Sequence, residues 1–343
     1  MIHRATRREF LATSVAAPLV LAAAGRLPAA EKTFSTQLKK AMICGRPAED
    51  HLRKLKAAGF DGVETTAADL APDDAAPCRQ VAENLGMKIH SVLRGWMEFN
   101  STDPAKVEET IQAAERSLRA AQAFGADAIL LVPCRIGDVK MPQPWEFDIE
   151  FDEATGHLRR VVKGDNEPYK AYIEAHDHAT DTSRQAVRKL IPVAEETGVV
   201  IAIENVWNNL WVKPDLFAHF VKSFDSPWVK AYFDIGNHVK YAPPEQFIRA
   251  LGPRSPPWQG EPAVARPRAT RLGELAKCHV KDFKLNPDGH GGNFCNIRDG
   301  SVNWPVVRKA LDEVGYSGWM TIEGGNCSLE EHSRRLDLIL AGN

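Results

Sequence analysis

The chain has 343 residues, of which 44% are hydrophobic, so it is long enough to bury a large core. It carries 43 Lys and Arg against 45 Asp and Glu, a formal net charge of −2 at pH 7. A chain this close to neutral has no strong attraction to a polyanion, so we expect no nucleic-acid partner. The length suits either two domains or one α/β barrel, and it leaves a homo-oligomer open.

Residues 1–30 have the pattern of a twin-arginine export signal. Arg7 and Arg8 lie in the stretch TRREFLA, an uncharged apolar run extends from Leu11 to Ala24, and small residues precede Glu31. This pattern predicts a periplasmic or secreted protein whose mature domain is 31–343. The apolar run is too short to span a bilayer comfortably, so no stable membrane span is expected after processing. An amphipathic first helix is the alternative interpretation.

The six cysteines show neither a CxxC pair nor a dense framework. They are therefore expected to be mostly free thiols, not disulfides or zinc-finger ligands. They are Cys44, Cys78, Cys134, Cys278, Cys295 and Cys327.

From residue 41 onward, short apolar strands alternate with segments of helical period. The clearest helix has Asp103 as its N-cap, Pro104 at its first position and Gly125 at its end. Eight such units favour the α/β class and a single (β/α)8 TIM barrel over an open sheet, and no GxGxxG motif follows the first strand. Strands are expected near 41–45, 60–64, 87–93, 127–133, 199–204, 229–234, 275–281 and 318–323.

Two segments interrupt this alternation. Residues 134–180 follow the fourth strand, so they are expected to form an extended βα loop at the active-site end of the barrel. The proline-rich segment Arg254–Arg271 precedes the seventh strand, and we expect it to be a surface insertion at the opposite end without a catalytic role.

Each of the last four predicted strands carries, at or near its end, a polar residue that can bind a metal. These residues are Glu204, Asp234, His279 and Glu323. Because the carboxyl ends of barrel strands meet at one end of the barrel, the four side chains should converge there. Three carboxylates at one place repel one another unless a positive charge lies among them. One divalent ion meets this need, with Mn²⁺ favoured and Mg²⁺, Co²⁺ or Zn²⁺ as alternatives.

Four motifs on these strands resemble signatures of the xylose isomerase-like TIM barrel superfamily, in its sugar-phosphate isomerase/epimerase branch. They are IAIENVWNN, YFDIGNHVKY, HVKDFK and GWMTIEGG, and they occur in the same order as in that branch. The resemblance covers the whole mature chain. It implies that Glu204, Asp234, His279 and Glu323 are the metal ligands, in agreement with their positions at the strand ends.

Five further residues are candidates for substrate binding. His238 resembles the histidine that contacts substrate hydroxyls in ketose epimerases of this superfamily, although their spacing from the aspartate is usually one residue shorter. Lys281 follows the predicted ligand histidine by two positions, so it is expected on the same inward face. Glu64, His90 and Trp207 lie at or just beyond strand ends and are expected to shape the pocket.

The predicted function is that of a metal-dependent sugar isomerase or epimerase. Glu204 and Glu323 would act as base and acid next to a sugar carbonyl, through an enediolate stabilised by the metal. A free ketose or an oxidised glycoside is favoured as the small-molecule substrate, because export and the absence of a glycine-rich phosphate loop disfavour a sugar phosphate. A 3-keto-glycoside lyase is the first alternative. A phosphodiester hydrolase similar to endonuclease IV is the second, and an inert sugar-binding protein is the third.

Overall fold

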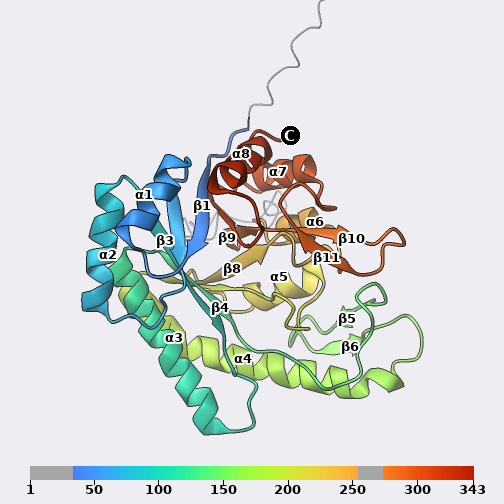
Figure 1. Ribbon diagram of the computed structural model, residues 1–343. Helices are drawn as coiled ribbons and strands as arrows, with labels where there is room; N and C mark the ends of the chain where they lie inside the picture. Colours follow the sequence, from blue (N-terminus) through green and yellow to red (C-terminus); the bar gives the residue numbers. More distant parts are fainter. Residues whose placement is uncertain (1–33, 254–272) are drawn as a thin grey trace, which may run out of the picture. The chain divides into compact units, whose positions relative to one another are not determined.

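The computed structural model describes residues 34–253 and 273–343, and these residues form a closed barrel of parallel strands in the order β1-β12-β9-β8-β7-β4-β3-β2 (Figure 1). All eight predicted strands are present, so the predicted (β/α)8 TIM barrel is confirmed. The predicted signal (1–30) and the insertion Arg254–Arg271 lie outside the described residues. The barrel strands are β1 (Leu38–Cys44), β2 (Gly62–Thr65), β3 (Lys88–Trp96), β4 (Ala128–Val132), β7 (Val200–Ile203), β8 (Val229–Asp234), β9 (Leu275–Val280) and β12 (Gly318–Ile322).

Helices surround the barrel on its outer face (Figure 1). In α3 the Asp103 side chain accepts a hydrogen bond from the backbone N–H of Ala105 at 2.9 Å, and Gly125 takes the left-handed conformation with φ 73°, so both predicted ends are confirmed. The helices are α1 (Glu49–Ala57), α2 (Pro72–Asn84), α3 (Pro104–Phe124), α4 (Lys170–Thr197), α5 (Pro214–Lys222), α6 (Pro244–Ala250), α7 (Trp304–Glu313) and α8 (Leu329–Leu340). Among the described residues, no helix is both long and apolar enough to cross a bilayer.

Two extended loops leave the carboxyl end of the barrel. The loop after β4 holds the short hairpin β5 (Glu150–Phe151) and β6 (Leu158–Arg160) and a 3₁₀ turn at Glu167–Tyr169. The loop ends where α4 begins, at Lys170, and not at the predicted 180. The prediction placed this end too late because polar residues on the first turns of α4 obscure its helical period. The loop after β9 holds the hairpin β10 (Asp282–Leu285) and β11 (Gly292–Cys295), which the sequence did not predict.

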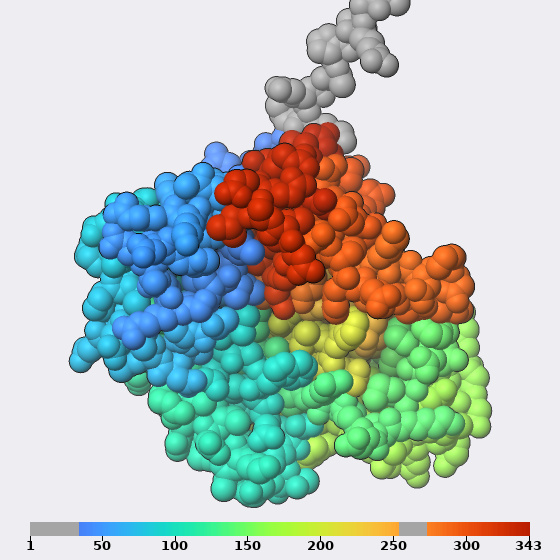
Figure 2. Space-filling model, viewed as in Figure 1, coloured from blue at the N-terminus to red at the C-terminus, as the bar shows by residue number. Residues whose placement is uncertain are grey.

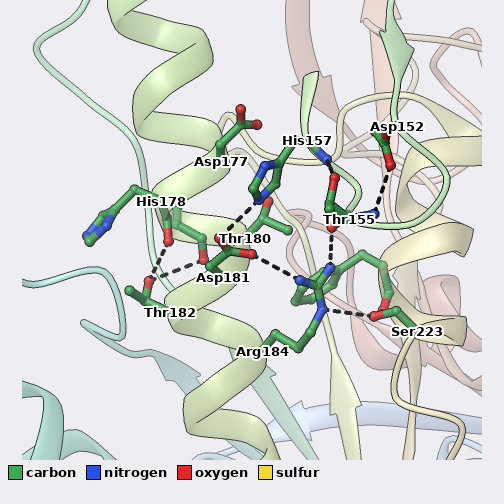
Figure 3. Close-up of polar contacts among 12 residues, drawn as sticks. Asp152, Thr155, His157, Asp177, His178, Thr180, Asp181, Thr182, Arg184 and Ser223 are labelled. Carbon is green, nitrogen blue, oxygen red and sulfur yellow. Dashed lines mark hydrogen bonds and ion pairs between the residues drawn. The ribbon is translucent and has the colours of Figure 1, made fainter. Parts of the chain in front are cut away.

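A polar network fixes the β5–β6 hairpin to the helices beneath it (Figure 3). The guanidinium of Arg184 donates to the Thr155 carbonyl at 2.7 Å, to Asp181 Oδ1 at 3.1 Å and to Ser223 Oγ at 3.3 Å. His157 Nε2 lies 3.0 Å from Asp181 Oδ2. Nε2 of His219, on α5, also lies 2.8 Å from the Glu153 carbonyl oxygen, so the hairpin is tied to both α4 and α5.

The two extended loops also contact each other. The indole ring of Trp145, in the loop after β4, stacks on the His290 ring between β10 and β11, with a centroid distance of 4.2 Å and an interplanar angle of 17°. Figure 2 shows the hairpin region in orange directly beside the green loop region on one side of the molecule. The loop after β9 is thus supported at its tip by the loop after β4.

Candidate metal centre and active site

The four predicted ligands come from four neighbouring barrel strands. Asp234 is the last residue of β8, and it is paired in register with His279 of β9. Glu204 and Glu323 follow β7 and β12 directly, and each still donates its backbone N–H to a carbonyl of the adjacent strand. Paired residues of parallel strands project to the same face, so this register turns the four side chains toward the barrel axis.

The structure brings these four side chains together. One donor atom from each of Glu204, Asp234, His279 and Glu323 lies within 4.8 Å of the other three. Asp234 and His279 are fully buried, whereas the Glu323 side chain is 32% exposed. Three carboxylate oxygens and one imidazole nitrogen form a donor set that suits a divalent cation.

Two buried donor atoms in this cluster lack hydrogen bonds. Asp234 Oδ2 and His279 Nδ1 have no hydrogen-bond partner within the part of the chain that the structure describes. Their nearest charged neighbours are Lys281 Nζ, 3.4 Å from the Asp234 oxygen, and Glu323 Oε2, 3.0 Å from the imidazole nitrogen. A buried polar atom without a partner is costly, and a shared metal ion would satisfy both. The residues present therefore fit a divalent ion.

The charges of the cluster lead to the same conclusion. Burial raises the pKa of Glu204 to about 8 and that of Asp234 to about 6, and repulsion from neighbouring carboxylates adds to both increases. Burial also acts to raise the pKa of Glu323, but His279 and Lys281 outweigh it and lower that pKa. Three ionised carboxylates are stable here only with positive charge among them.

Glu64 of β2 lies behind the predicted ligand histidine. Its Oε2 is 2.5 Å from His279 Nε2, and both side chains are buried. This contact leaves Nδ1 of the imidazole directed at the carboxylate cluster. A carboxylate that accepts the distal N–H of a histidine fixes the tautomer and orientation of a metal ligand. The structure therefore gives Glu64 a supporting place behind the ligands and not the pocket-lining place that the sequence suggested.

Asn237 connects the ligands to the loop after β8. Its backbone N–H donates to Asp234 Oδ1 at 2.8 Å, and its side-chain amide donates to Glu204 Oε1 at 3.2 Å. Its carbonyl accepts a 2.7 Å hydrogen bond from Nε1 of Trp207, which places that predicted residue at the edge of the cluster. The sequence reasoning missed Asn237, although an asparagine three residues after a strand-end aspartate is typical of a tight turn.

His238 does not face the ligand cluster. Its Nδ1 donates to the Asp234 carbonyl at 2.8 Å, and its Nε2 lies 2.5 Å from Oδ1 of Asn205. The ring packs against Phe233 and Phe247, and burial lowers its pKa to about 4. With both nitrogens occupied and no exposed surface, His238 supports the loop, in contrast to the predicted contact with substrate.

His90 lies deeper in the barrel than the sequence suggested. Its Nε2 is 2.9 Å from Thr321 Oγ1, and its ring stacks on Trp319 at a centroid distance of 4.5 Å. Thr321 lies on β12, two residues before Glu323. The contact between His90 and Thr321 is therefore on the amino-terminal side of the predicted ligands. His90 is a buried core residue there and does not line the carboxyl end of the barrel.

Lys281 is at the cluster, as predicted. Its Nζ lies 2.8 Å from Glu323 Oε1 and 3.4 Å from Asp234 Oδ2. Gly236 permits this arrangement, because a Cβ atom at that position would lie 2.7 Å from the carbonyl oxygen of Lys281. The ammonium group thus neutralises part of the carboxylate charge, and the Lys281 side chain remains 15% exposed.

Comparison with known proteins identifies relatives of the chain. The family model described as Xylose isomerase-like TIM barrel matches residues 52–337. An uncharacterised protein of Methanocaldococcus jannaschii is 26% identical over 149 residues, which is 43% of this chain. The match spans 44% of that relative's length.

Solved structures with the same fold include two named as epimerases or epimerase-like. A D-tagatose 3-epimerase-like protein has a TM-score of 0.60 and 16% identity, with 88% of this chain and 98% of that chain covered. The 3-keto-D-glucoside 4-epimerase from E. coli has a TM-score of 0.58 and 14% identity, with coverage of 88% and 99%. A barrel protein from Mycobacterium smegmatis in complex with magnesium has a TM-score of 0.56 and 20% identity, with coverage of 90% and 96%. Since the family model spans most of the chain and the strand order closes the same barrel, the chain belongs to the xylose isomerase-like TIM barrel family.

Proposed function

We propose that this protein is a divalent-metal-dependent sugar isomerase or epimerase that acts on a ketose or related keto sugar. One observation carries the proposal: Glu204 and Glu323 come from the two outer strands of a four-strand arc, with Asp234 and His279 on the strands between them. Two carboxylates so placed flank whatever binds between them. The epimerase names among the structural neighbours support the same reaction class.

The four side chains would hold one divalent ion, with Mn²⁺ favoured and Mg²⁺, Co²⁺ or Zn²⁺ as alternatives. Such an ion, when bound, supplies Lewis-acid stabilisation of negative charge on the carbonyl and hydroxyl oxygens of the sugar. The neighbour from M. smegmatis in complex with magnesium supports a divalent cation in this fold.

The protein's own residues would perform the proton transfers. The proton on the carbon next to a carbonyl is too weakly acidic for water to remove at a useful rate, so a placed carboxylate is needed. In this proposal one of Glu204 and Glu323 removes that proton, and the other returns a proton on the opposite face to give an epimer. Return to the neighbouring carbon gives an isomer. The Lys281 ammonium would donate a hydrogen bond to the sugar oxygen that gains charge.

Solvent exchange tests this proposal. Incubation of the Mn²⁺-loaded protein with ketoses and 3-keto-glycosides in deuterated water should place deuterium on the carbon next to the carbonyl. The variants Glu204→Gln and Glu323→Gln should lose about 10²- to 10⁴-fold in exchange rate, the usual contribution of a general base. An epimer or isomer identifies the proposed activity, whereas a released aglycone and an unsaturated keto sugar identify the lyase alternative. Near-normal exchange in both variants contradicts the paired-carboxylate mechanism.

Metal content is an independent check. The purified protein should retain about one divalent ion per chain after dialysis, and Asp234→Ala or His279→Ala should abolish that retention. Elemental analysis measures both, and retention in both variants would exclude this cluster as the metal site. The endonuclease-like alternative would require more histidines, whereas the cluster found among the described residues contains one.

We also propose that the protein is exported by the twin-arginine route to the periplasm or beyond. This proposal rests on Arg7, Arg8 and the uncharged run from Leu11 to Ala24. Export supports a free ketose or an oxidised glycoside over a sugar phosphate.

A further inference from the structure

An exposed aromatic ring lies on the β10–β11 hairpin, beside the four candidate metal ligands. The Phe294 side chain on β11 is 44% exposed. Its ring stacks on Trp207 at a centroid distance of 4.9 Å and meets Phe283 edge-on at 5.3 Å. Large apolar side chains are usually buried, and this one is supported by two other rings while much of it faces solvent.

The Phe294 ring is adjacent to the proposed reaction centre. Lys281 Nζ lies 4.9 Å from the centroid of Phe294 and 2.8 Å from Glu323 Oε1. A single ammonium group therefore separates the aromatic ring from a predicted metal ligand. Trp207 is linked to the cluster through Asn237, because its indole N–H donates to the Asn237 carbonyl and the Asn237 amide donates to Glu204 Oε1.

The hairpin that carries Phe294 is anchored at both ends. At its base, the buried Asp282 carboxylate accepts hydrogen bonds from the backbone N–H of Arg298 at 2.8 Å and from the indole N–H of Trp304 at 3.0 Å. At its tip, His290 stacks on Trp145 of the loop after β4. The Phe294 ring is thus held in place before any ligand arrives, which reduces the entropy cost of binding against it.

The Trp207 ring is covered by Phe294 and by Lys240 Nζ, which lies 3.5 Å from its centroid, so Trp207 serves as the support and Phe294 as the exposed ring. We propose that Phe294, backed by Trp207, forms a stacking subsite for a second ring attached to the reacting sugar, so that the substrate is a glycoside and not a free monosaccharide. This inference rests on the proposed function, because that function places the reacting sugar at the four candidate metal ligands. A monosaccharide held there would need only the ligands and Lys281. The apolar face of an adjacent sugar ring or aromatic aglycone matches a flat aromatic surface one side chain away.

Binding of unreactive glucosides tests this subsite. Methyl β-D-glucoside, phenyl β-D-glucoside and cellobiose would be titrated calorimetrically into the Mn²⁺-loaded protein. The variants are Phe294→Ala, Phe294→Tyr, which keeps an aromatic ring, and Trp96→Ala as a matched control. Trp96 is 48% exposed at the carboxyl end of β3, so it is a comparable exposed aromatic residue on a different strand.

We expect phenyl β-D-glucoside or cellobiose to bind about tenfold more tightly than methyl β-D-glucoside, the effect of one good stacking contact. The preferred ligand shows whether the second ring is an aglycone or a sugar. Phe294→Ala should abolish the preference, while Phe294→Tyr and Trp96→Ala should retain it. Equal binding of all three ligands by the wild-type protein, no binding of any, or an unchanged preference in Phe294→Ala would overturn the proposal. A Phe294-dependent preference without solvent exchange on any sugar would leave the subsite standing and refute the proposed reaction.

Discussion

Replacement of Glu64 by glutamine tests whether this buried carboxylate orients a metal ligand. Glu64 Oε2 lies 2.5 Å from Nε2 of His279, and neither side chain is more than 1% exposed. Glutamine has nearly the same shape and can still accept a hydrogen bond, so the variant removes the charge and little else. We therefore expect the fold to persist and the metal affinity to fall.

The expected loss follows from the geometry. Carboxylates that hold a ligand histidine typically contribute about 10- to 100-fold to metal affinity. At a metal concentration about 100 times the wild-type Kd, binding stabilises the wild-type protein by about 2.7 kcal/mol. With a tenfold weaker Kd the same concentration contributes only about 1.4 kcal/mol, and with a hundredfold weaker Kd about 0.4 kcal/mol. The metal-induced rise in Tm should therefore be about halved or smaller.

Two measurements check this expectation. Calorimetric titration with Mn²⁺ gives the Kd, and thermal unfolding with and without Mn²⁺ gives the stabilisation. Glu83→Gln is a matched control, because Glu83 is a half-exposed residue of α2 that pairs with Arg79 at 2.7 Å. If the Kd of Glu64→Gln for Mn²⁺ is within threefold of the Kd of the control, Glu64 does not act through the predicted ligand His279. Our interpretation of this contact would then be wrong.

Two other perturbations test the loop after β8 and the export signal. Gly236→Ala should push on the backbone of Lys281 and lower the free energy of unfolding by about 1–3 kcal/mol, measured with denaturant. Gly137→Ala should be close to neutral, because a Cβ atom there would meet nothing within 4 Å beyond its chain neighbours. Equal stabilities of the two variants would contradict the tight approach of Gly236 to Lys281. Replacement of both Arg7 and Arg8 by lysine should leave the protein in the cytoplasm on cell fractionation, and unchanged export would exclude the twin-arginine route.

The fold and the convergence of the four candidate ligands could be predicted because each depends on strand pattern and topology. Glu204, Asp234 and Glu323 each end an apolar run, and His279 lies one residue before the end of β9. A closed barrel brings the carboxyl ends of its strands together whatever the loops do. Neither inference needs the direction of a residue more than one position beyond a strand. The convergence of these side chains was therefore accessible from spacing alone.

Side chains beyond the strand ends could not be predicted in the same way. His238 turns away from the cluster because the loop after Asp234 folds back through a hydrogen bond to Asn237, and its ring enters the apolar space next to Phe247. The β10–β11 hairpin was missed because its short strands carry little apolar pattern, although the turn residues of NPDG, residues 286–289, indicate a reversal of the chain. Phe294 owes its place to that hairpin.

The last prediction concerns Lys281, whose ammonium group would compete with a metal ion for the same carboxylates. Its Nζ lies 2.8 Å from Glu323 Oε1 and 3.4 Å from Asp234 Oδ2, so it neutralises part of their charge when no cation is bound. A divalent ion brought to these oxygens would be repelled by the ammonium group at short range. Removal of that charge should therefore increase the affinity for the metal and lower the stability of the metal-free protein.

Lys281→Met keeps most of the aliphatic side chain and removes the charge, so we expect Mn²⁺ affinity to rise by about tenfold, equivalent to about 1.4 kcal/mol. Loss of one partner from a largely buried ion pair should lower the unfolding free energy of the metal-free protein by about 3 kcal/mol. Lys281→Arg retains the charge and is the matched control. Titration calorimetry and denaturant unfolding of both metal-free variants measure the two effects. Weaker Mn²⁺ binding by Lys281→Met than by Lys281→Arg would show that the ammonium group helps to build the metal site instead of competing for it.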